Sequence, residues 1–123
     1  MRMYRNLNTT EKKWIDKLLD IDFEGKDILA EQILKSQVTH KKEYAFISLK
    51  FEEINNVRKY PYPIRVPVEM RAYQDESAPI VFLLHIIDGL VNELEIISAD
   101  LSEIIESAIS LKRVEYEVNK EVL

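Results

Sequence analysis

The apolar residues near the start of the chain have the spacing of amphipathic helices. Residues 9–20 carry four apolar side chains on one helical stripe: Trp14, Ile15, Leu18 and Leu19. Asn8 or Thr9 is suited to cap this helix, because a short polar side chain accepts a hydrogen bond from the first turn. Gly25 then interrupts the pattern, and residues 27–35 resume it. The pattern predicts two consecutive helices.

Further along the chain the period changes from helical to the two-residue alternation of strands. Residues 44–51 are dense in aromatic and aliphatic side chains, and residues 64–73 alternate strictly between apolar and polar. Pro67 lies inside the second run, and a proline there favours an edge strand or a bulge. Residues 101–109 fit one or two helical turns, and residues 111–118 alternate again. The polar runs around Lys41-Lys42 and Arg58-Lys59 are expected to be loops.

Residues 80–97 contain two apolar runs that meet at Asp88-Gly89. An Asp-Gly pair supplies the positive φ angles of a type I′ turn, so this stretch predicts a β-hairpin. A continuous ladder from that turn places polar groups inside an otherwise apolar ribbon. The pairs that it predicts are Ile87 with Leu90, His85 with Asn92, Leu84 with Glu93, and Phe82 with Glu95.

Together these elements predict the α+β class, with two N-terminal helices packed on one face of an antiparallel sheet of about five strands. The chain has 123 residues, of which 46% are hydrophobic and 32% are charged. This length suits one ordinary hydrophobic core and is short for two. We therefore expect a single domain over residues 1–123.

The charge balance narrows the classes of partner. The chain carries 17 basic and 22 acidic residues, for a formal net charge of −5. This excess of acid gives no electrostatic reason to expect nucleic acid or an anionic membrane as a partner. No apolar run approaches the ~20 residues of a membrane span, and the first residues lack the apolar region of a secretory signal. With no cysteine in the chain, a cytoplasmic location is the simplest expectation.

Several kinds of chemistry lack the residues that they need. The only two glycines, Gly25 and Gly89, cannot form either of the glycine-rich phosphate loops. The only two histidines, His40 and His85, have no zinc-ligand spacing, so no metal and no cofactor are expected. No serine lies in a recognised nucleophile motif.

Polar residues of the predicted strands form the candidate binding or functional surface: Arg65, Glu69, Arg71, His85, Asp88, Glu93 and Glu95. One interpretation is an acid/base or ligand-clamping site, with carboxylates that orient the histidine and arginines that hold an anion. The other, which we favour, is a set of ordinary cross-strand ion pairs on an exposed sheet. For His85 the simplest interpretation is a neutral, partly buried ring that bonds Asn92 or the backbone.

Three segments resemble, in the same order, a family of small bacterial proteins of unknown function. They are FEGKD at residues 23–27, RVPVE at residues 65–69 and LLHIIDGLVNELEI at residues 83–96, which match FxGxD, RVPVE and LLHxxDGxxxELEI. The chain departs from the family after Ile97, where Ser98-Ala99-Asp100 contains no glycine. The resemblance implies no established activity. It implies which positions to test first: Arg65, Glu69, His85, Asp88, Glu93 and Glu95.

Three hypotheses of function follow from the sequence. The leading one is a non-enzymatic protein-binding module of an accessory or immunity type, because the chain is small and acidic and has no catalytic motif. The alternative is a small enzyme or small-molecule binder that uses His85 with Glu93 or Glu95 and an arginine clamp. A homodimer formed through an uncapped strand edge is the third.

Overall fold

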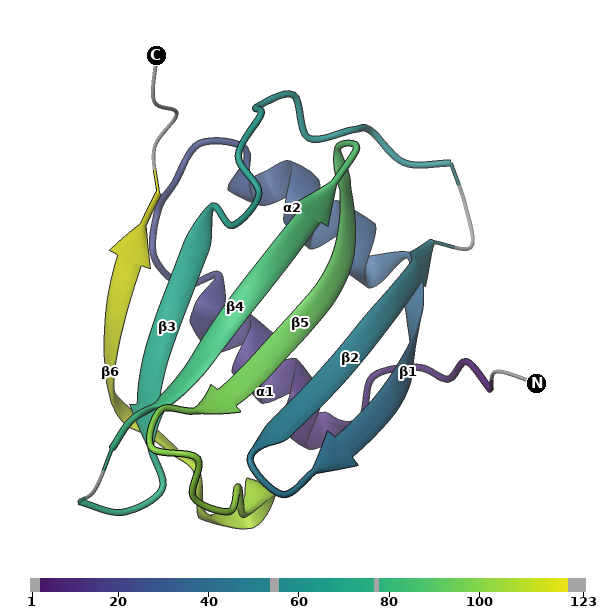
Figure 1. Ribbon diagram of the computed structural model, residues 1–123. Coiled ribbons are helices and arrows are strands. Elements are labelled where there is room, and N and C mark those ends of the chain that lie inside the picture. Colours follow the sequence, from purple (N-terminus) through teal and green to yellow (C-terminus); the bar gives the residue numbers. More distant parts are fainter. Residues whose placement is uncertain (1–2, 54–55, 77, 120–123) are drawn as a thin grey trace.

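The computed structural model describes residues 3–53, 56–76 and 78–119 and consists of two helices and a curved sheet (Figure 1). The elements are α1 (Thr9–Leu18), α2 (Lys26–Leu34), β1 (Ser36–Glu43), β2 (Phe46–Glu53), β3 (Val68–Tyr73), β4 (Ile80–Ile87), β5 (Leu90–Ser98), the 3₁₀ helix η1 (Glu106–Ala108) and β6 (Ser110–Val118). The strands form one antiparallel sheet in the order β1-β2-β5-β4-β3-β6. The predicted α+β class is confirmed, with six strands instead of about five.

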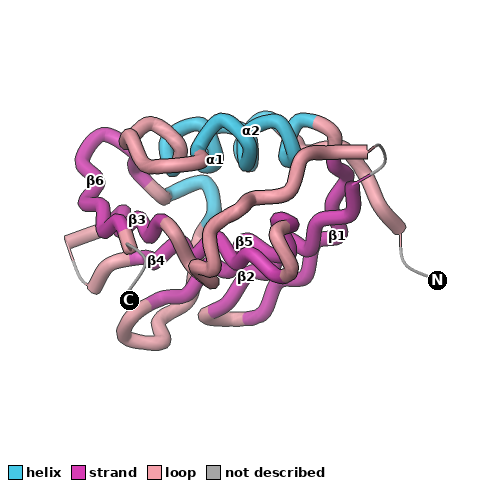
Figure 2. The backbone as a smooth tube through the Cα atoms, turned by 90° about the horizontal axis from the view of Figure 1, so that it is seen from above, coloured by secondary structure: helices cyan, strands magenta, loops and turns pink. Residues whose placement is uncertain are grey.

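The helices and the sheet form two layers, and the helices lie on only one face of the sheet (Figure 2). Strands β3 and β4 alternate between fully buried side chains toward the helices and partly exposed ones on the other face. Trp14 of α1 meets Phe82 of β4 edge to face, with ring centroids 5.7 Å apart. We call the side of the sheet that faces away from the helices the outer face.

Two local predictions were wrong, and a third was confirmed only in part. The run around Lys41-Lys42 was expected to be a loop, but it belongs to β1, which pairs with β2 along its whole length and has buried side chains only in its first half. The strand predicted over residues 64–73 begins at Val68, and it lies between β4 and β6, so Pro67 does not mark an edge strand. The helical turns predicted over residues 101–109 are reduced to η1.

The hairpin has the predicted turn but not the predicted register. Asp88 and Gly89 have φ angles of 52° and 78°, as a type I′ turn requires. The ladder then shifts, because Ile86 pairs with Val91. The next pair is His85 with Glu93, so Asn92 is an extra residue in β5, a β-bulge. The predicted pairing is therefore wrong beyond Ile86.

The fully buried side chain of Gln32 in α2 supports this bulge. Its Oε1 accepts a hydrogen bond from the Val91 N–H at 2.8 Å. Its Nε2 donates to the carbonyl of Arg58 at 2.7 Å and to the carbonyl of Gly89 at 2.9 Å. One amide thus ties the tip of the hairpin and the loop before β3 to helix α2, and no polar atom of Gln32 is left without a partner.

Candidate functional site

The bulge at Asn92 decides which side chains of β5 reach the outer face. Beyond the bulge, Leu94 and Ile96 are fully buried against the helices, and Glu93 and Glu95 lie on the opposite side. The predicted Phe82–Glu95 pair is replaced by a Leu83–Glu95 pair, which leaves no carboxylate in the core at this point. His85 lies on the outer face, on the side of the sheet opposite to Leu94 and Ile96.

His85 is the centre of a chain of three polar side chains from β5, β4 and the segment before β3. The His85 Nε2 atom lies 2.9 Å from Glu95 Oε1, and the Arg65 Nε donates to His85 Nδ1 at 3.3 Å. A guanidinium can only donate, so Nδ1 is the acceptor and Nε2 carries the proton that is shared with Glu95. Neither nitrogen of the ring is free in this arrangement.

Glu93 belongs to a second cluster beside the first. Ser48 of β2 donates its hydroxyl proton to Glu93 at 2.5 Å, and the Lys50 ammonium lies 3.5 Å from the same carboxylate. The side chain of Glu93 is only 14% exposed, so these contacts compensate a largely buried charge. Ser48 and Lys50 were not predicted as site residues, because the sequence does not show that β2 lies next to β5.

The remaining predicted residues lie apart from His85. Arg71 pairs with Glu69 at 2.7 Å and with Glu117 of β6 at 3.6 Å. Leu83 separates this group from Glu95, because Leu83 pairs with Glu69 on one side and with Glu95 on the other. Asp88 is exposed at the hairpin tip. The structure therefore divides the seven predicted residues into separate groups.

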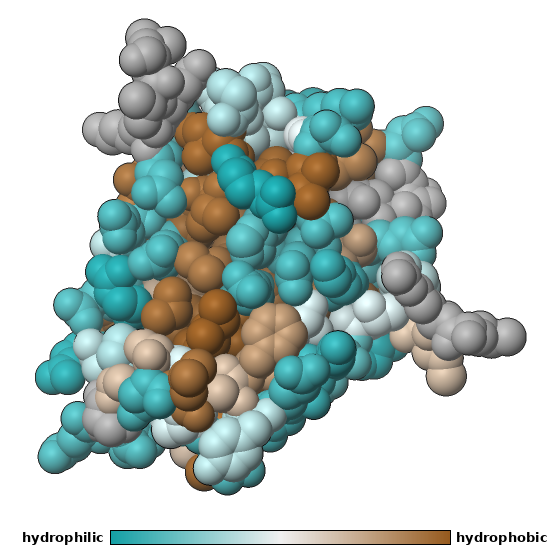
Figure 3. Space-filling view, viewed as in Figure 1, coloured by the Kyte–Doolittle hydropathy of each residue, from teal (hydrophilic) through white to brown (hydrophobic). Residues whose placement is uncertain are grey.

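Apolar side chains also gather on the outer face (Figure 3). Ile97 of β5 pairs with Phe46 of β2 on one side and with Val81 of β4 on the other, and Leu83 is two residues farther along β4. All four side chains are half-buried, and no helix covers them. We call Phe46, Val81, Leu83 and Ile97 the outer apolar band.

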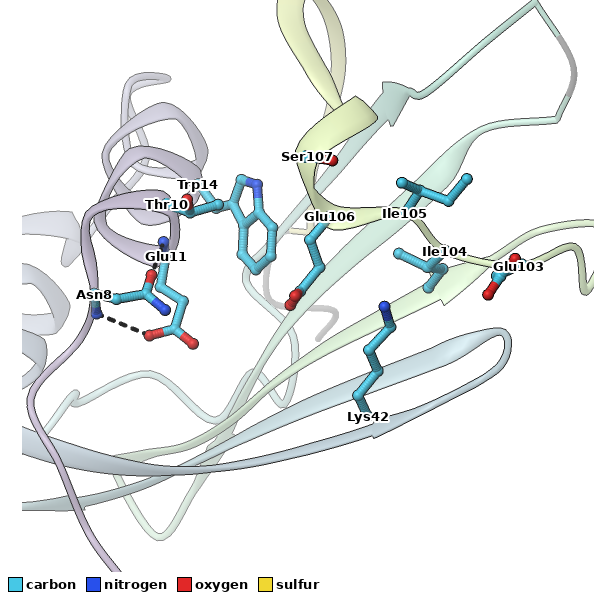
Figure 4. A pocket seen from close by; sticks show the side chains of 10 residues that line it. All are labelled: Asn8, Thr10, Glu11, Trp14, Lys42, Glu103, Ile104, Ile105, Glu106 and Ser107. Atoms are coloured by element: carbon cyan, nitrogen blue, oxygen red, sulfur yellow. Dashed lines mark hydrogen bonds between the residues drawn. The ribbon is translucent and has the colours of Figure 1, made fainter.

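A pocket of about 450 Å³ lies at the start of α1, between the end of β1 and the segment before β6 (Figure 4). On its wall is Glu11, which is 2% exposed and closes a capping box with Asn8. Arg5 binds both carboxylate oxygens of Glu11 at 2.8 Å. Burial alone would raise the pKa of Glu11, but the bonds from Arg5 and from the Asn8 N–H outweigh it and hold the pKa below the ordinary 4.5.

The other charges of this pocket are compensated in part. Glu106 lies 3.3 Å from His40 of β1, and Lys42 extends toward the space between Glu106 and Ile104 (Figure 4). These contacts tie together segments that are far apart in the sequence. Sequence reasoning missed the cluster, because nothing local relates the N-terminal segment to β1 or to residue 106.

At both edges of the sheet, the row of unpaired backbone N–H and C=O groups is interrupted or protected. Arg5 exchanges two backbone hydrogen bonds with Val38, at 2.7 and 2.9 Å, and so covers part of the β1 edge. At the other edge, the register between β3 and β6 shifts beyond Arg71, and β6 carries several charged side chains. Native proteins use covered edges, irregular register and charged side chains to prevent an edge strand from pairing with another chain. A homodimer through a strand edge stays a prediction.

Within residues 3–53, 56–76 and 78–119, no group of three or more metal-ligating side chains occurs. No helix among the described residues is long and apolar enough to cross a membrane.

Comparisons with protein-family models, with curated proteins and with solved structures find no match to this chain. The resemblance based on RVPVE and LLHxxDGxxxELEI therefore stays a prediction.

Proposed function

We propose that the chain is a non-enzymatic protein-binding module whose partner docks on the outer face of the sheet. The observation that carries this proposal is the outer apolar band, which lies on the face that the helices leave uncovered. The buried centre of a protein–protein interface is rich in apolar side chains of this kind, and a rim of polar groups surrounds it.

The charges around the band support the proposal. Glu93 and Glu95 flank it on β5, and each already has a partner within the chain. Arg71, near the other side, is paired with Glu69. Covering a charge costs less when its hydrogen bonds and countercharge are already in place. A partner that lies over the band would therefore meet few unpaired charges near its centre.

An enzyme or small-molecule binder centred on His85 is the alternative. The close approach of His85 to Glu95 and Arg65 favours it, because carboxylates and arginines orient imidazoles in many active sites. A base must have a free nitrogen, however, and both nitrogens of His85 are engaged. Catalysis would require Arg65 to release the ring, so we place this alternative second.

Site-specific photo-crosslinking tests the proposal. A photoreactive benzophenone side chain replaces Val81 in the outer apolar band, and in a matched control it replaces Lys13, which is exposed on α1. In a lysate of the cells that make the protein, we expect a crosslinked partner from position 81 and not from position 13. Excess wild-type protein should compete for this partner, and excess Ile97→Glu protein should not.

The control on folding is a thermal melt of the Ile97→Glu protein. Ile97 is only half-buried, so the variant should remain folded at the assay temperature. If positions 81 and 13 give the same crosslinking pattern, or if the Ile97→Glu protein competes as well as the wild type, the proposal is wrong.

A further inference from the structure

Arg65 differs from the other cations near the outer face. Lys50 is paired with Glu93, Arg71 is paired with Glu69, and the guanidinium of Arg113 lies over the ring of Tyr73. Arg65 is exposed, and among the described residues no carboxylate lies within ion-pair distance of its guanidinium. Within the described part of the chain, the guanidinium contacts only His85, through Nε, and its two terminal nitrogens are unengaged.

The guanidinium is nevertheless held in place. Glu95 positions His85 through Nε2, and Nδ1 of His85 accepts the Nε–H of Arg65. The carbonyl of Arg65 also accepts a hydrogen bond from the N–H of Ile86 at 2.7 Å. An arginine fixed at both its backbone and its Nε loses little conformational freedom when its two terminal nitrogens bind a planar anion.

Arg65 also lines a pocket of about 400 Å³. Its walls include Tyr62, Ile64 and Ile87, and Ile87 is 37% exposed. Asp88 also lines it, with an exposed carboxylate that no described residue pairs with. The pocket thus combines an apolar wall, a cation with two free donors, and an acceptor for an N–H group.

We propose that this pocket binds the C-terminal residue of the partner chain, with its carboxylate on Arg65 and its apolar side chain against Ile64 and Ile87. A terminal residue carries its carboxylate and its side chain on the same Cα atom, so both can enter one small pocket. In an extended chain, an acidic side chain and its apolar neighbour point to opposite sides, and only one of them can enter. Asp88 then accepts a backbone N–H of the bound chain.

This inference rests on the proposed function, because it names what the docked protein presents. The probe is N-acetylglycyl-L-leucine, and its C-terminal amide is the matched control. We expect the acid to shift the amide NMR signals of residues 62–65 and 86–89 of the labelled full chain in a saturable way. The amide should bind about 10-fold more weakly or worse, because it loses charge-assisted hydrogen bonds.

Variants assign the effect to Arg65. In Arg65→Gln the acid should bind as weakly as the amide does to wild type, and Arg65→Lys should be intermediate, since it keeps the charge without the fork. Lys13→Gln, which removes an exposed cation on α1 away from the outer face, should bind the acid as wild type does. Dispersed amide spectra of each variant establish that it is folded.

Three results would overturn the inference. The first is equal affinity of the wild type for the acid and the amide, and the second is undiminished binding of the acid by Arg65→Gln. The third is binding of N-acetyl-Asp-Leu-amide, whose only carboxylate is on a side chain, as tightly as the acid. The test is separable from that of the proposed function. If the acid binds through Arg65 but no partner is crosslinked from position 81, the proposed function fails and this site remains. If a partner is crosslinked but the acid and the amide bind equally, only this inference fails.

Discussion

Replacing Gln32 by leucine tests whether one buried amide holds the β4–β5 hairpin in its register. Leucine has nearly the volume of glutamine, so the change removes hydrogen bonds and leaves little cavity. Val91 is 1% exposed, and without Gln32 its N–H has no recorded acceptor. A buried donor without a partner costs about 1–3 kcal/mol.

The two carbonyls that Gln32 serves are affected less. The carbonyl of Gly89 keeps the N–H of Tyr60 at 2.8 Å, and Arg58 is an exposed residue whose carbonyl can bond water. We therefore expect Gln32→Leu to lower the free energy of unfolding by about 2–4 kcal/mol in total. Leu94 and Ile96 should still face the core, because a one-residue slip would turn both toward water.

Urea denaturation measures the loss, and hydrogen exchange at the Val91 amide locates it. Gln37→Leu is the matched control, because the amide of Gln37 makes only an exposed contact with Asn6 at 3.3 Å. It should change the stability by less than about 0.5 kcal/mol. If Gln32→Leu costs no more than this control, or leaves exchange at Val91 unchanged, the structural role assigned to Gln32 is wrong.

Three other changes test separate parts of the structure by the same denaturation assay. Glu11→Gln should cost about 1–3 kcal/mol at pH 7. The depressed pKa of Glu11 stabilises the fold above its ordinary value of 4.5, so the gap to wild type should close as the pH falls through the folded-state pKa, and a constant gap would contradict this. Gly25→Ala should cost about 2–4 kcal/mol, because Gly25 has a φ angle of +83° and a Cβ atom there would lie 2.4 Å from Tyr60 Cε1. Unchanged stability of this variant would disprove the clash. Glu95→Gln should cost less than about 1 kcal/mol, because the partly exposed pair with His85 is a weak stabiliser, and a much larger loss would make the pair a structural element.

Local patterns predicted the elements whose signals are local. The type I′ turn followed from Asp88-Gly89, and helix α1 followed from apolar spacing and a capping residue. The strand count was low because β1, with the sequence SQVTHKKE, has almost no apolar alternation. Its pairing with β2 supplies the hydrogen bonds that define it, and an edge strand needs few buried side chains.

The register of the hairpin was predictable, although the prediction made from the turn was wrong. In β5 the buried apolar residues are Val91, Leu94 and Ile96. The first two are three positions apart, whereas buried residues of a regular strand are two positions apart. That gap shows one extra residue in the strand, and the turn count ignored it. The contact that stabilises the bulge could not be predicted, because Gln32 lies 59 residues before Val91.

The composition of the outer face follows from the same bulge. If Asn92 paired with His85 in a regular ladder from the turn, Glu93 would lie opposite Leu84 and Glu95 opposite Phe82, on the buried face. The bulge moves both carboxylates to the uncovered face, where Glu95 reaches His85 and, through it, orients Arg65. The proposed docking surface and the pocket proposed to bind a carboxylate thus depend on one irregularity in one strand. A Gln32 variant that remains folded but loosens this bulge should weaken binding at Arg65, because Gln32 bonds the N–H of Val91 beside the bulge and the carbonyl of Gly89 in the pocket wall. The stability of the hairpin is in this way linked to its proposed function.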